Sequence, residues 1–278
     1  MKGPALKKKA FLCIASLLLL LAPLFVRAEY GEFAIVSDTH VGAPGSAYPE
    51  FIRNVEQEGI SMIVHTGDAI DSPGSLSQWA QFFDITGSGK RLFLAPGNHD
   101  IRGPKSLEVY LRFFGAPYFS ASDGDTLLLF LNTELPVEES RIAGEQLAWL
   151  RSETARPFRY KFVFLHEPLF PVIPLHGLDR HEQERDSLHL LFVRSGVSLV
   201  VAGHDHVYDK RLKDDVVYVI AGRTGGQAFL QSGNGDMCYL TVKRTGDSYS
   251  FEAKKMDGEA KDRFTVRRDA SARQAVEK

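Results

Sequence analysis

The stretch EFAIVSDTH, residues 32–40, combines the two features that decide the fold: an apolar run and polar residues at its end. The run is apolar and β-branched, which is typical of a strand buried on both faces. Similar runs span residues 60–66, 91–96, 125–132, 160–166, 197–203 and 215–222. Segments with helical character lie between them, near 47–58, 75–85, 104–114, 144–155 and 182–195. Strands that alternate with helices indicate an α/β layered domain.

The last part of the chain follows a different pattern. Residues 236–257 predict two strands around a turn at 245–248, so we expect antiparallel pairing and mixed sheets. Residues from 258 onward are charged and carry few apolar side chains. The sequence therefore predicts a domain over residues 29–257 and a charged C-terminal segment, 258–278, that is flexible at its end.

The first 28 residues differ in composition from the rest of the chain. Four lysines within residues 2–9 precede an uncharged apolar stretch, residues 10–26, and the small residue Ala28 follows soon after. This order is typical of a secretory signal peptide and predicts export after cleavage behind Ala28, to a periplasm or the outside. The alternative is a membrane anchor formed by uncleaved residues 10–26, whose length approaches the roughly 20 residues that span a bilayer.

The composition of the mature chain excludes several classes of protein. The 278 residues are 44% hydrophobic and 24% charged, as in an ordinary globular protein. Without residues 1–28 the chain has 28 basic and 35 acidic residues, a net charge of −7, which does not attract nucleic acid. Cys238 is then the only cysteine, so no internal disulfide can form. No segment after residue 28 is apolar enough to span a membrane.

Polar residues that can bind metals follow the ends of five of the predicted strands. Ligands of α/β sheets lie outside the carboxyl ends of the strands, so we expect these residues to share one cleft. Carboxylate, amide and imidazole groups together suit Mn, Fe or Zn. There are more candidates than one tetrahedral site needs, and they suit two divalent ions that share a bridging carboxylate. The candidate ligands are Asp38, His40, Asp68, Asn98, His166, His204 and His206.

The five blocks of polar residues resemble the motifs of the calcineurin-like metallophosphoesterase superfamily. The sequence has DTH at 38–40, GDAID at 67–71, GNHD at 97–100, His166 alone, and GHDH at 203–206, in the family order. One block is weak support, but five in order are specific. The resemblance implies a four-layer α/β sandwich of two mixed sheets flanked by helices. It also implies hydrolysis of phosphate mono- or diesters by in-line attack of a hydroxide that bridges two ions.

The resemblance further implies a role for each motif residue. Asp38, His40 and His206 would hold the first ion, and Asn98, His166 and His204 the second. Asp68 would bridge the two ions. His99 would give a proton to the leaving group, and Asp71 would orient His99. Purple acid phosphatases of the same superfamily carry a tyrosine where this chain has Asp71, so a tyrosinate-bound ferric ion is not expected.

Other residues and other functions remain open at the level of sequence. Arg102 and Arg223 could contact a small phosphate-ester substrate, as could His176 and His181 in the long loop after His166. One alternative function is a catalytically silent scaffold of the same fold, against which the intact ligand set argues. Another is a lipid-linked diphosphate hydrolase, for which no basic amphipathic surface helix stands out. The sequence leaves the natural substrate, the native metal and the oligomeric state undetermined.

Overall fold

The computed structural model of the chain describes residues 30–229 and 236–268. The signal peptide or anchor predicted for residues 1–28 lies outside the described residues, and so do residues 269–278. Within the described ranges, no helix has the length and apolar character needed to cross a membrane.

Two six-stranded mixed sheets form the centre of the molecule. The first has the order β12-β11-β10-β1-β2-β3 and the second the order β4-β5-β6-β7-β9-β8. The strands of the first sheet are β1 (Glu32–Val36), β2 (Met62–His65), β3 (Arg91–Leu94), β10 (Cys238–Thr245), β11 (Ser248–Lys255) and β12 (Ala260–Arg267). Those of the second are β4 (Phe119–Asp123), β5 (Thr126–Phe130), β6 (Tyr160–Phe164), β7 (Leu199–Ala202), β8 (Tyr208–Lys213) and β9 (Val216–Ala221).

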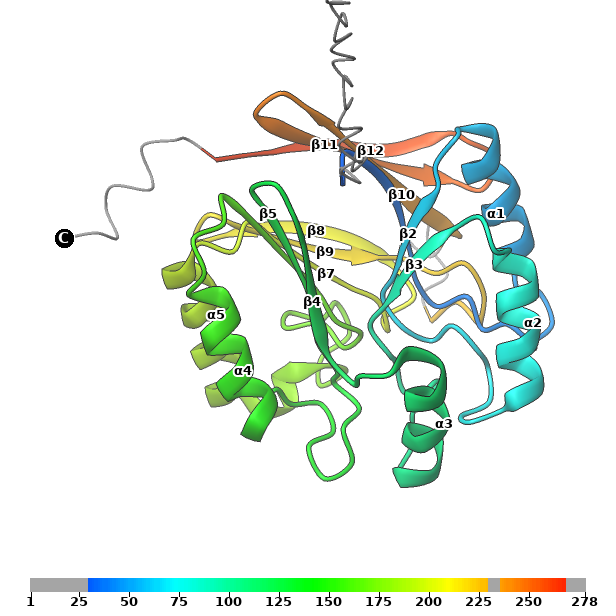
Figure 1. Ribbon diagram of the computed structural model, residues 1–278, viewed down its shortest axis with the longest axis horizontal. Coiled ribbons are helices and arrows are strands. Elements are labelled where there is room, and N and C mark those ends of the chain that lie inside the picture. The colour runs from blue at the N-terminus through cyan, green and yellow to red at the C-terminus, as the bar shows by residue number, and fades with distance from the viewer. Residues whose placement is uncertain (1–29, 230–235, 269–278) are drawn as a thin grey trace, which may run out of the picture.

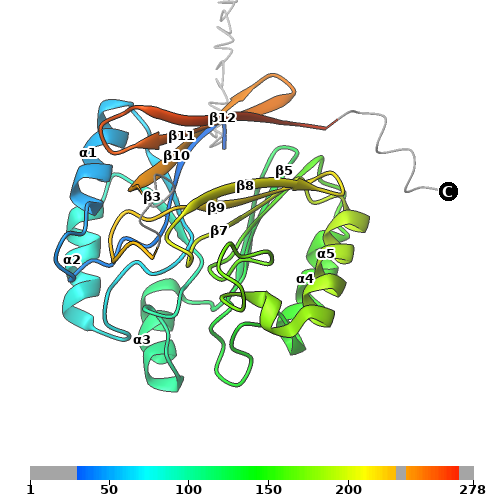
Figure 2. The ribbon, with the colours of Figure 1, turned by 180° about the vertical axis from the view of Figure 1, so that it is seen from behind.

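Helices cover the outer faces of both sheets (Figures 1 and 2). The first sheet carries α1 (Tyr48–Gln57), α2 (Leu76–Thr86) and α3 (Pro104–Phe114), and the second carries α4 (Gly144–Thr154) and α5 (Glu182–Ser195). A short 3₁₀ helix, η1 (Leu178–His181), leads into α5. The sequence-based expectation of a four-layer sandwich of two mixed sheets flanked by helices is confirmed.

Three apolar clusters hold the four layers together. One lies between the sheets and includes Ile35, Phe162 and Leu240. The other two lie between each sheet and its helices, one around Trp79 and one around Leu150. Side chains alternate across a strand, so each strand in the middle of a sheet feeds two clusters, which explains why these strands are apolar throughout.

Local signals in the sequence explain where the helices begin and end. The hydroxyl of Ser75 accepts a hydrogen bond from the backbone N–H of Gln78, which satisfies one of the free donors at the start of α2. Pro104 occupies the first turn of α3, where its missing N–H costs nothing. Gly196 ends α5 in the left-handed conformation, with φ of 72°.

The topology places five strand ends at one edge of the molecule. In the first sheet β1, β2 and β3 run parallel to one another, and in the second β6 and β7 do the same. Each of these strands is followed by one of the five polar blocks found in the sequence. Because the carboxyl ends of parallel strands face the same way, both sheets bring their polar blocks to this edge.

Three strands lie where the sequence analysis expected none. The first sheet extends past the predicted domain boundary at residue 257, because β12 pairs in antiparallel register with β11. Phe264 of β12 stacks on Phe251 at 4.7 Å between ring centroids, and Val266 is buried. The other two, β4 and β8, are edge strands of the second sheet. Edge strands are commonly polar and short, which hides them from a search for apolar runs.

Candidate metal centre

The polar residues at the strand ends adopt an unusual backbone conformation. Asp38, His40, Asp68, His204 and His206 all have positive φ, between 44° and 70°. Non-glycine residues rarely occupy this left-handed region, since the side chain crowds the backbone there. Such strain collects at functional sites, where surrounding contacts impose it.

Two glycines of the motifs leave room for the ligand side chains. A β-carbon on Gly203 would lie 1.9 Å from the hydroxyl oxygen of Ser37 and 2.5 Å from a carboxylate oxygen of Asp38. A β-carbon on Gly97 would lie 2.3 Å from a carboxylate oxygen of Asp68. Any larger residue would displace these carboxylates, so the glycines of GNH and GHxH are required by close approach.

Two groups of ligand atoms share the carboxylate of Asp68. Within each group, one ligand atom from every member lies within 4.8 Å of all the others. The first group is Asp38, His40, Asp68 and His206, and the second is Asp68, His166 and His204. The structure thus brings six of the seven sequence-predicted ligands together, as two adjacent sets with one common member.

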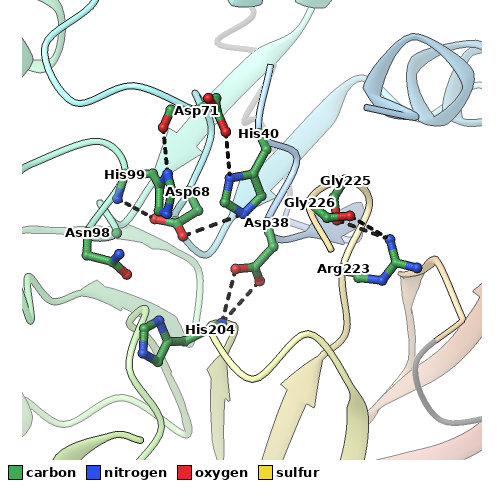
Figure 3. A network of polar contacts seen from close by, with 12 residues as sticks. Asp38, His40, Asp68, Asp71, Asn98, His99, His204, Arg223, Gly225 and Gly226 are labelled. Carbon is green, nitrogen blue, oxygen red and sulfur yellow. Dashed lines mark hydrogen bonds and ion pairs between the residues drawn. The ribbon is translucent and has the colours of Figure 1, made fainter. Parts of the chain in front are cut away.

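The seventh predicted ligand, Asn98, lies beside the second group. Its side-chain Oδ1 is 3.2 Å from Nε2 of His166. The same His166 nitrogen lies 3.1 Å from Nδ1 of His204 and 3.4 Å from Oδ2 of Asp68. The amide oxygen of Asn98 therefore faces the same point as the other members of the second group (Figure 3).

Backbone carbonyls set the orientation of two of the imidazoles. Nδ1 of His166 lies 2.9 Å from the carbonyl oxygen of Thr66, and Nδ1 of His206 lies 2.5 Å from that of Gln227. A carbonyl only accepts, so each Nδ1 carries the proton and donates it. The lone pair of each Nε2 then faces the interior of the site, which is how metal-binding histidines are normally held.

The arrangement of lone pairs fits cations at both groups. Nε2 of His40 and Nε2 of His206 face each other at 3.3 Å, with Oδ1 of Asp38 3.3 Å from the latter. In the second group, Nδ1 of His204 and Nε2 of His166 face each other at 3.1 Å. Electron-rich atoms packed this closely repel one another unless positive charge lies among them. The donor set of carboxylate, amide and imidazole is one that divalent transition metals accept.

The charges of the acidic ligands follow from their surroundings. Burial by itself raises the pKa of Asp68, but the imidazole of His166 lowers this pKa by more, so the net shift is downward. Burial also raises the pKa of Asp38, but the imidazole of His206 outweighs burial and brings this pKa down to about 2. Both carboxylates are therefore ionised at neutral pH, as ligands of a cation must be.

Asp71 contacts His99 through its backbone carbonyl, whereas the role predicted from the sequence calls for its carboxylate. Nδ1 of His99 donates to the backbone carbonyl of Asp71 at 2.5 Å, and not to the carboxylate (Figure 3). The carboxylate of Asp71 instead lies 3.8 Å from Nδ1 of His40. Since His40 Nδ1 has no hydrogen-bond partner, Asp71 is placed to steady His40 rather than His99.

His99 contacts the shared ligand Asp68 and the first-group ligand His40, but it belongs to neither of the two groups that share Asp68. Its backbone N–H donates to Oδ1 of Asp68 at 2.8 Å, and its ring packs edge-on against that of His40 at 4.6 Å between centroids. Nδ1 of His99 is engaged by the Asp71 carbonyl, so a further partner of the ring would have to bind Nε2.

Two of the four residues expected to contact substrate lie beside the centre. His176 stacks on His204 at 4.0 Å between ring centroids, and its Nδ1 lies 2.7 Å from the carboxylate of Asp205. Arg102 is exposed and, with Asn98, lines a cavity next to the second group. Both side chains lie next to the candidate centre, and their contact with a substrate stays a prediction.

The other two residues, His181 and Arg223, have different neighbours, and their contact with a substrate also stays a prediction. His181 lies where η1 meets α5 and lines a separate cavity with Arg141 and Glu184. The guanidinium of Arg223 donates to the carbonyls of Gly225 and Gly226 (Figure 3). A β-carbon on Gly226 would lie 2.7 Å from the ring of His206, so Arg223 holds a turn that packs against a ligand.

Asp100, the last residue of GNHD, has a structural role that its sequence position does not reveal. Its carboxylate accepts hydrogen bonds from the backbone N–H groups of Ala69, Ile70 and Gly97. These bonds join the loop after β2 to the loop after β3. Burial and the nearby charge of Asp68 raise the pKa of Asp100 to about 7. The motif contains this residue, but only the folded chain shows what its carboxylate binds.

Comparison with curated proteins finds relatives that carry the name serine/threonine-protein phosphatase CPPED1. The protein of Danio rerio is 29% identical over 185 residues, which cover 59% of this chain and 60% of the relative. The human protein is 30% identical over 133 residues, 41% of each chain. The chain thus spans about half the length of the curated relatives it matches.

Comparison with solved structures supports the fold. A purple acid phosphatase from yellow lupin (Lupinus luteus) seeds superposes with a TM-score of 0.71 and 18% identity over 87% of this chain and 55% of that one. GAP50, described as the anchor in the inner membrane complex of Plasmodium, gives a TM-score of 0.66 at 15% identity. The match covers 88% of this chain and 94% of GAP50. A dimetal phosphatase from Danio rerio gives a TM-score of 0.61 at 12% identity, and the match covers 86% of this chain and 99% of that one.

The family assignment rests on the segment that carries all five polar blocks. Residues 31–208 match the sequence profile of the calcineurin-like phosphoesterases, a metal-dependent family. The matched segment begins one residue before β1 and ends just after the second histidine of GHDH. With the sandwich fold and the clustered ligands already established, the chain belongs to the calcineurin-like phosphoesterase family.

Proposed function

We propose that this protein hydrolyses phosphate mono- or diesters with a centre of two divalent ions. One observation carries the proposal: the carboxylate of Asp68 belongs to both groups of ligand atoms. A shared carboxylate holds two ions close together, which is the arrangement suited to displacement at phosphorus. The names of the curated relatives, which are protein phosphatases, support the same reaction class.

The proposed ligands divide between the two groups. Asp38, His40 and His206 complete the first with Asp68, and Asn98, His166 and His204 complete the second. Two divalent ions would supply positive charge against the phosphate oxygens and a water of lowered pKa as the nucleophile. Mn, Fe and Zn all suit these side chains.

The chain's own residues then act on the substrate and on the leaving group. The backbone N–H of His99 binds the shared carboxylate, and Nδ1 binds the Asp71 carbonyl, so the ring lies next to the centre and its Nε2 can give a proton to the departing oxygen. His176 forms part of the wall of the site through its stacking on His204. A water nucleophile makes a serine or cysteine nucleophile unnecessary, and buried Cys238 is not needed for the reaction.

The proposal is tested with purified protein of residues 29–278 and a panel of mono- and diesters. The protein is freed of metal and reloaded with Mn, Fe, Zn or Mg before each assay. We expect hydrolysis that depends on added metal and is lost in Asp68→Asn. A protein that binds two ions per chain and hydrolyses none of the esters would overturn the proposal and support the scaffold alternative.

We also propose that the mature protein is exported after cleavage behind Ala28. The basic start and the apolar stretch 10–26 support this proposal. Terminal sequencing of the exported protein is expected to begin at Glu29. Recovery of the whole chain in the membrane fraction alone would show instead that residues 10–26 anchor it.

A further inference from the structure

Two rings, those of Phe229 and His176, form an aromatic wall beside the metal centre. The ring of Phe229 stacks on that of His206, with centroids 4.5 Å apart and planes 21° from parallel. The ring of His176 stacks in the same way on His204, at 4.0 Å and 17°. The two rings of the wall meet nearly at right angles, at 5.5 Å and 82°. Because His206 belongs to the first ligand group and His204 to the second, the aromatic wall lies against both groups.

The aromatic wall is open to solvent, although it covers ligands that are buried. Phe229 is 50% exposed and the side chain of His176 is 26% exposed, whereas His206 is 5% exposed. One face of the Phe229 ring covers His206, so the exposed half of Phe229 is turned away from this ligand. His176 also borders, with Asn98 and His204, a cavity of about 260 Å³ beside the second group. Apolar surface around a few polar groups is what the organic part of a small ligand contacts.

Hydrogen bonds hold both halves of the aromatic wall in place. The buried carboxylate of Asp205 lies 2.7 Å from Nδ1 of His176 and accepts from two backbone N–H groups of the loop before His176. Phe229 follows two residues after Gln227, whose carbonyl receives the Nδ1 proton of His206. Asp205 and His206 both belong to the GHDH motif, so each ring is fixed to the segment that carries the ligands. A surface that is already ordered costs little conformational entropy when a ligand binds to it.

The aromatic wall and the proposed proton donor lie against different ligands. His99 packs on His40 at 4.6 Å between ring centroids, and its backbone N–H binds Asp68. The aromatic wall packs on His206 and His204 instead, and Figure 3 shows His99 and His204 well apart. The alcohol that departs must lie next to His99 to receive its proton. A group that rests on the aromatic wall therefore belongs to a part of the ester that stays on phosphorus.

This separation distinguishes the two kinds of phosphate ester. In a monoester the only organic group is the alcohol that leaves. A diester keeps a second alcohol on phosphorus while the first departs, and this retained alcohol needs a surface of its own. Phe229 offers an exposed aromatic ring for it, and such rings attract other rings by offset stacking or edge-to-face contact.

We propose that the aromatic wall binds the retained alcohol of a phosphodiester and that this alcohol carries an aromatic ring. The inference rests on the proposed phosphoesterase function and selects diesters within it. The oxygen of water bonds to phosphorus as the P–O bond to the leaving alcohol breaks, and the leaving oxygen takes a proton. The products are the free alcohol and a monoester that keeps the aromatic group. Phe229 is the residue that determines this specificity, and His176 completes the surface.

The test uses diesters that share one leaving group. Benzyl 4-nitrophenyl phosphate and ethyl 4-nitrophenyl phosphate both release nitrophenolate, and the retained alcohol has a phenyl ring in the first where it has a methyl group in the second. The quantity compared is the ratio of kcat/KM for the benzyl ester to kcat/KM for the ethyl ester, measured with metal-loaded protein. Wild type is expected to favour the benzyl ester roughly tenfold, and Phe229→Ala to bring the ratio to within about twofold of one.

The monoester 4-nitrophenyl phosphate shows which alcohol Phe229 contacts. Its single organic group departs, so we expect Phe229→Ala to lower kcat/KM for the benzyl diester several-fold more than for this monoester. An equal fall for both esters would place Phe229 on the leaving alcohol and overturn the inference. Phe229→Leu keeps an apolar cover on His206 and removes only the ring, so it decides the ratio if Phe229→Ala loses metal.

Phe113→Ala is the matched control. Phe113 is 42% exposed, close to the value for Phe229, but its ring packs against Trp79 and Phe83 of α2 and not against a ligand. This variant is expected to keep the wild-type ratio of the two diesters within about twofold, because stacking on a substrate ring requires contact with it. A loss in Phe113→Ala equal to that in Phe229→Ala would overturn the inference.

Binding of phosphinates gives a readout that does not depend on turnover. Benzyl(methyl)phosphinate and ethyl(methyl)phosphinate carry two C–P bonds, which resist hydrolysis, and the single negative charge of a diester. Calorimetric titration is expected to show that metal-loaded wild type binds the benzyl compound roughly tenfold more tightly and that Phe229→Leu binds both within about twofold. Equal affinity of wild type for both would overturn the inference.

The outcomes separate this inference from the function on which it rests. Hydrolysis of the monoester without hydrolysis of either diester would overturn the inference and leave the proposed function standing. Loss of all ester hydrolysis would count against the proposed function, while the phosphinate titration would still decide the inference.

Discussion

Nε2 of His65 lies 3.0 Å from the hydroxyl oxygen of Thr39, and this contact joins the first ligand-bearing loop to the end of β2. The Thr39 hydroxyl donates to the carbonyl of Ala69 at 2.8 Å, so it accepts from Nε2–H of His65. Nδ1 of the same ring accepts from the backbone N–H of Gly67 at 3.1 Å. A neutral imidazole satisfies both partners, whereas a protonated one would point an N–H at another N–H.

We predict that His65 makes the fold sensitive to acid. Burial lowers the pKa of His65 to about 3, below the usual 6.5, so the unfolded chain binds more protons between these values. Stability therefore rises with pH across this window and falls by about 1.4 kcal/mol for each unit of acidification. Urea unfolding of metal-free protein at pH 6.5 and 5.0 is expected to show a loss about 2 kcal/mol larger in wild type than in His65→Gln. Equal losses in both proteins would show that His65 does not titrate in this way.

Asp68→Asn is expected to remove both ions, because its carboxylate is shared by the two groups. His206→Ala is expected to weaken the first group and leave the second, since His206 belongs to the first group alone. Elemental analysis of the dialysed proteins gives the number of ions per chain. Two ions per chain in Asp68→Asn would refute the bridging assignment.

Asp71→Asn is expected to weaken the first ion and spare the second. The carboxylate of Asp71 faces the unpartnered Nδ1 of His40, and loss of such a supporting carboxylate typically costs about 10–100-fold in metal affinity. Competition with a chelator measures the affinity of each ion. The backbone contact to His99 does not involve the Asp71 side chain, so proton donation is expected to persist. Normal metal affinity with a selective loss of activity on alkyl esters would instead restore the carboxylate of Asp71 as the partner of His99.

His99→Ala is expected to keep its metals and lose activity in proportion to the leaving group's need for a proton. Removing a general acid costs about 10²–10⁴-fold in rate for an alkyl phosphate, and much less for nitrophenyl phosphate. Rates on both esters are measured with metal content determined in parallel. If the two rates fall equally while both ions remain, His99 positions the phosphate and does not donate a proton.

A chain that ends at Asp257 is expected to be less stable than one that ends at Arg268. The shorter chain loses β12, and with it the buried Val266 and the stacking of Phe264 on Phe251. Burial of two such side chains contributes about 3–6 kcal/mol. Arg268 also donates to the Ser198 hydroxyl and the Val197 carbonyl, so the longer chain retains its tie to the second sheet. Thermal unfolding compares the two, and equal midpoints would show that β12 is dispensable.

Much of the fold could be read from patterns within single segments. Buried strands such as β2 and β6 are apolar throughout because both of their faces are covered, and this needs no knowledge of their neighbours. The strand β12 does not stand out in the sequence, because only alternate residues face the core and most of the others are charged. Pairing with β11, and not the composition of β12 itself, is what places it in the sheet.

The sequence by itself determined which residues would meet at the metal centre, because five polar blocks each follow a strand and parallel strand ends share an edge. Only the tertiary structure decided which atom of each residue faces which partner. The carboxylate of Asp71 turns to His40, while the backbone carbonyl of Asp71 accepts a hydrogen bond from His99. Such contacts join residues far apart in the chain, and their geometry depends on packing between two sheets that no single segment encodes.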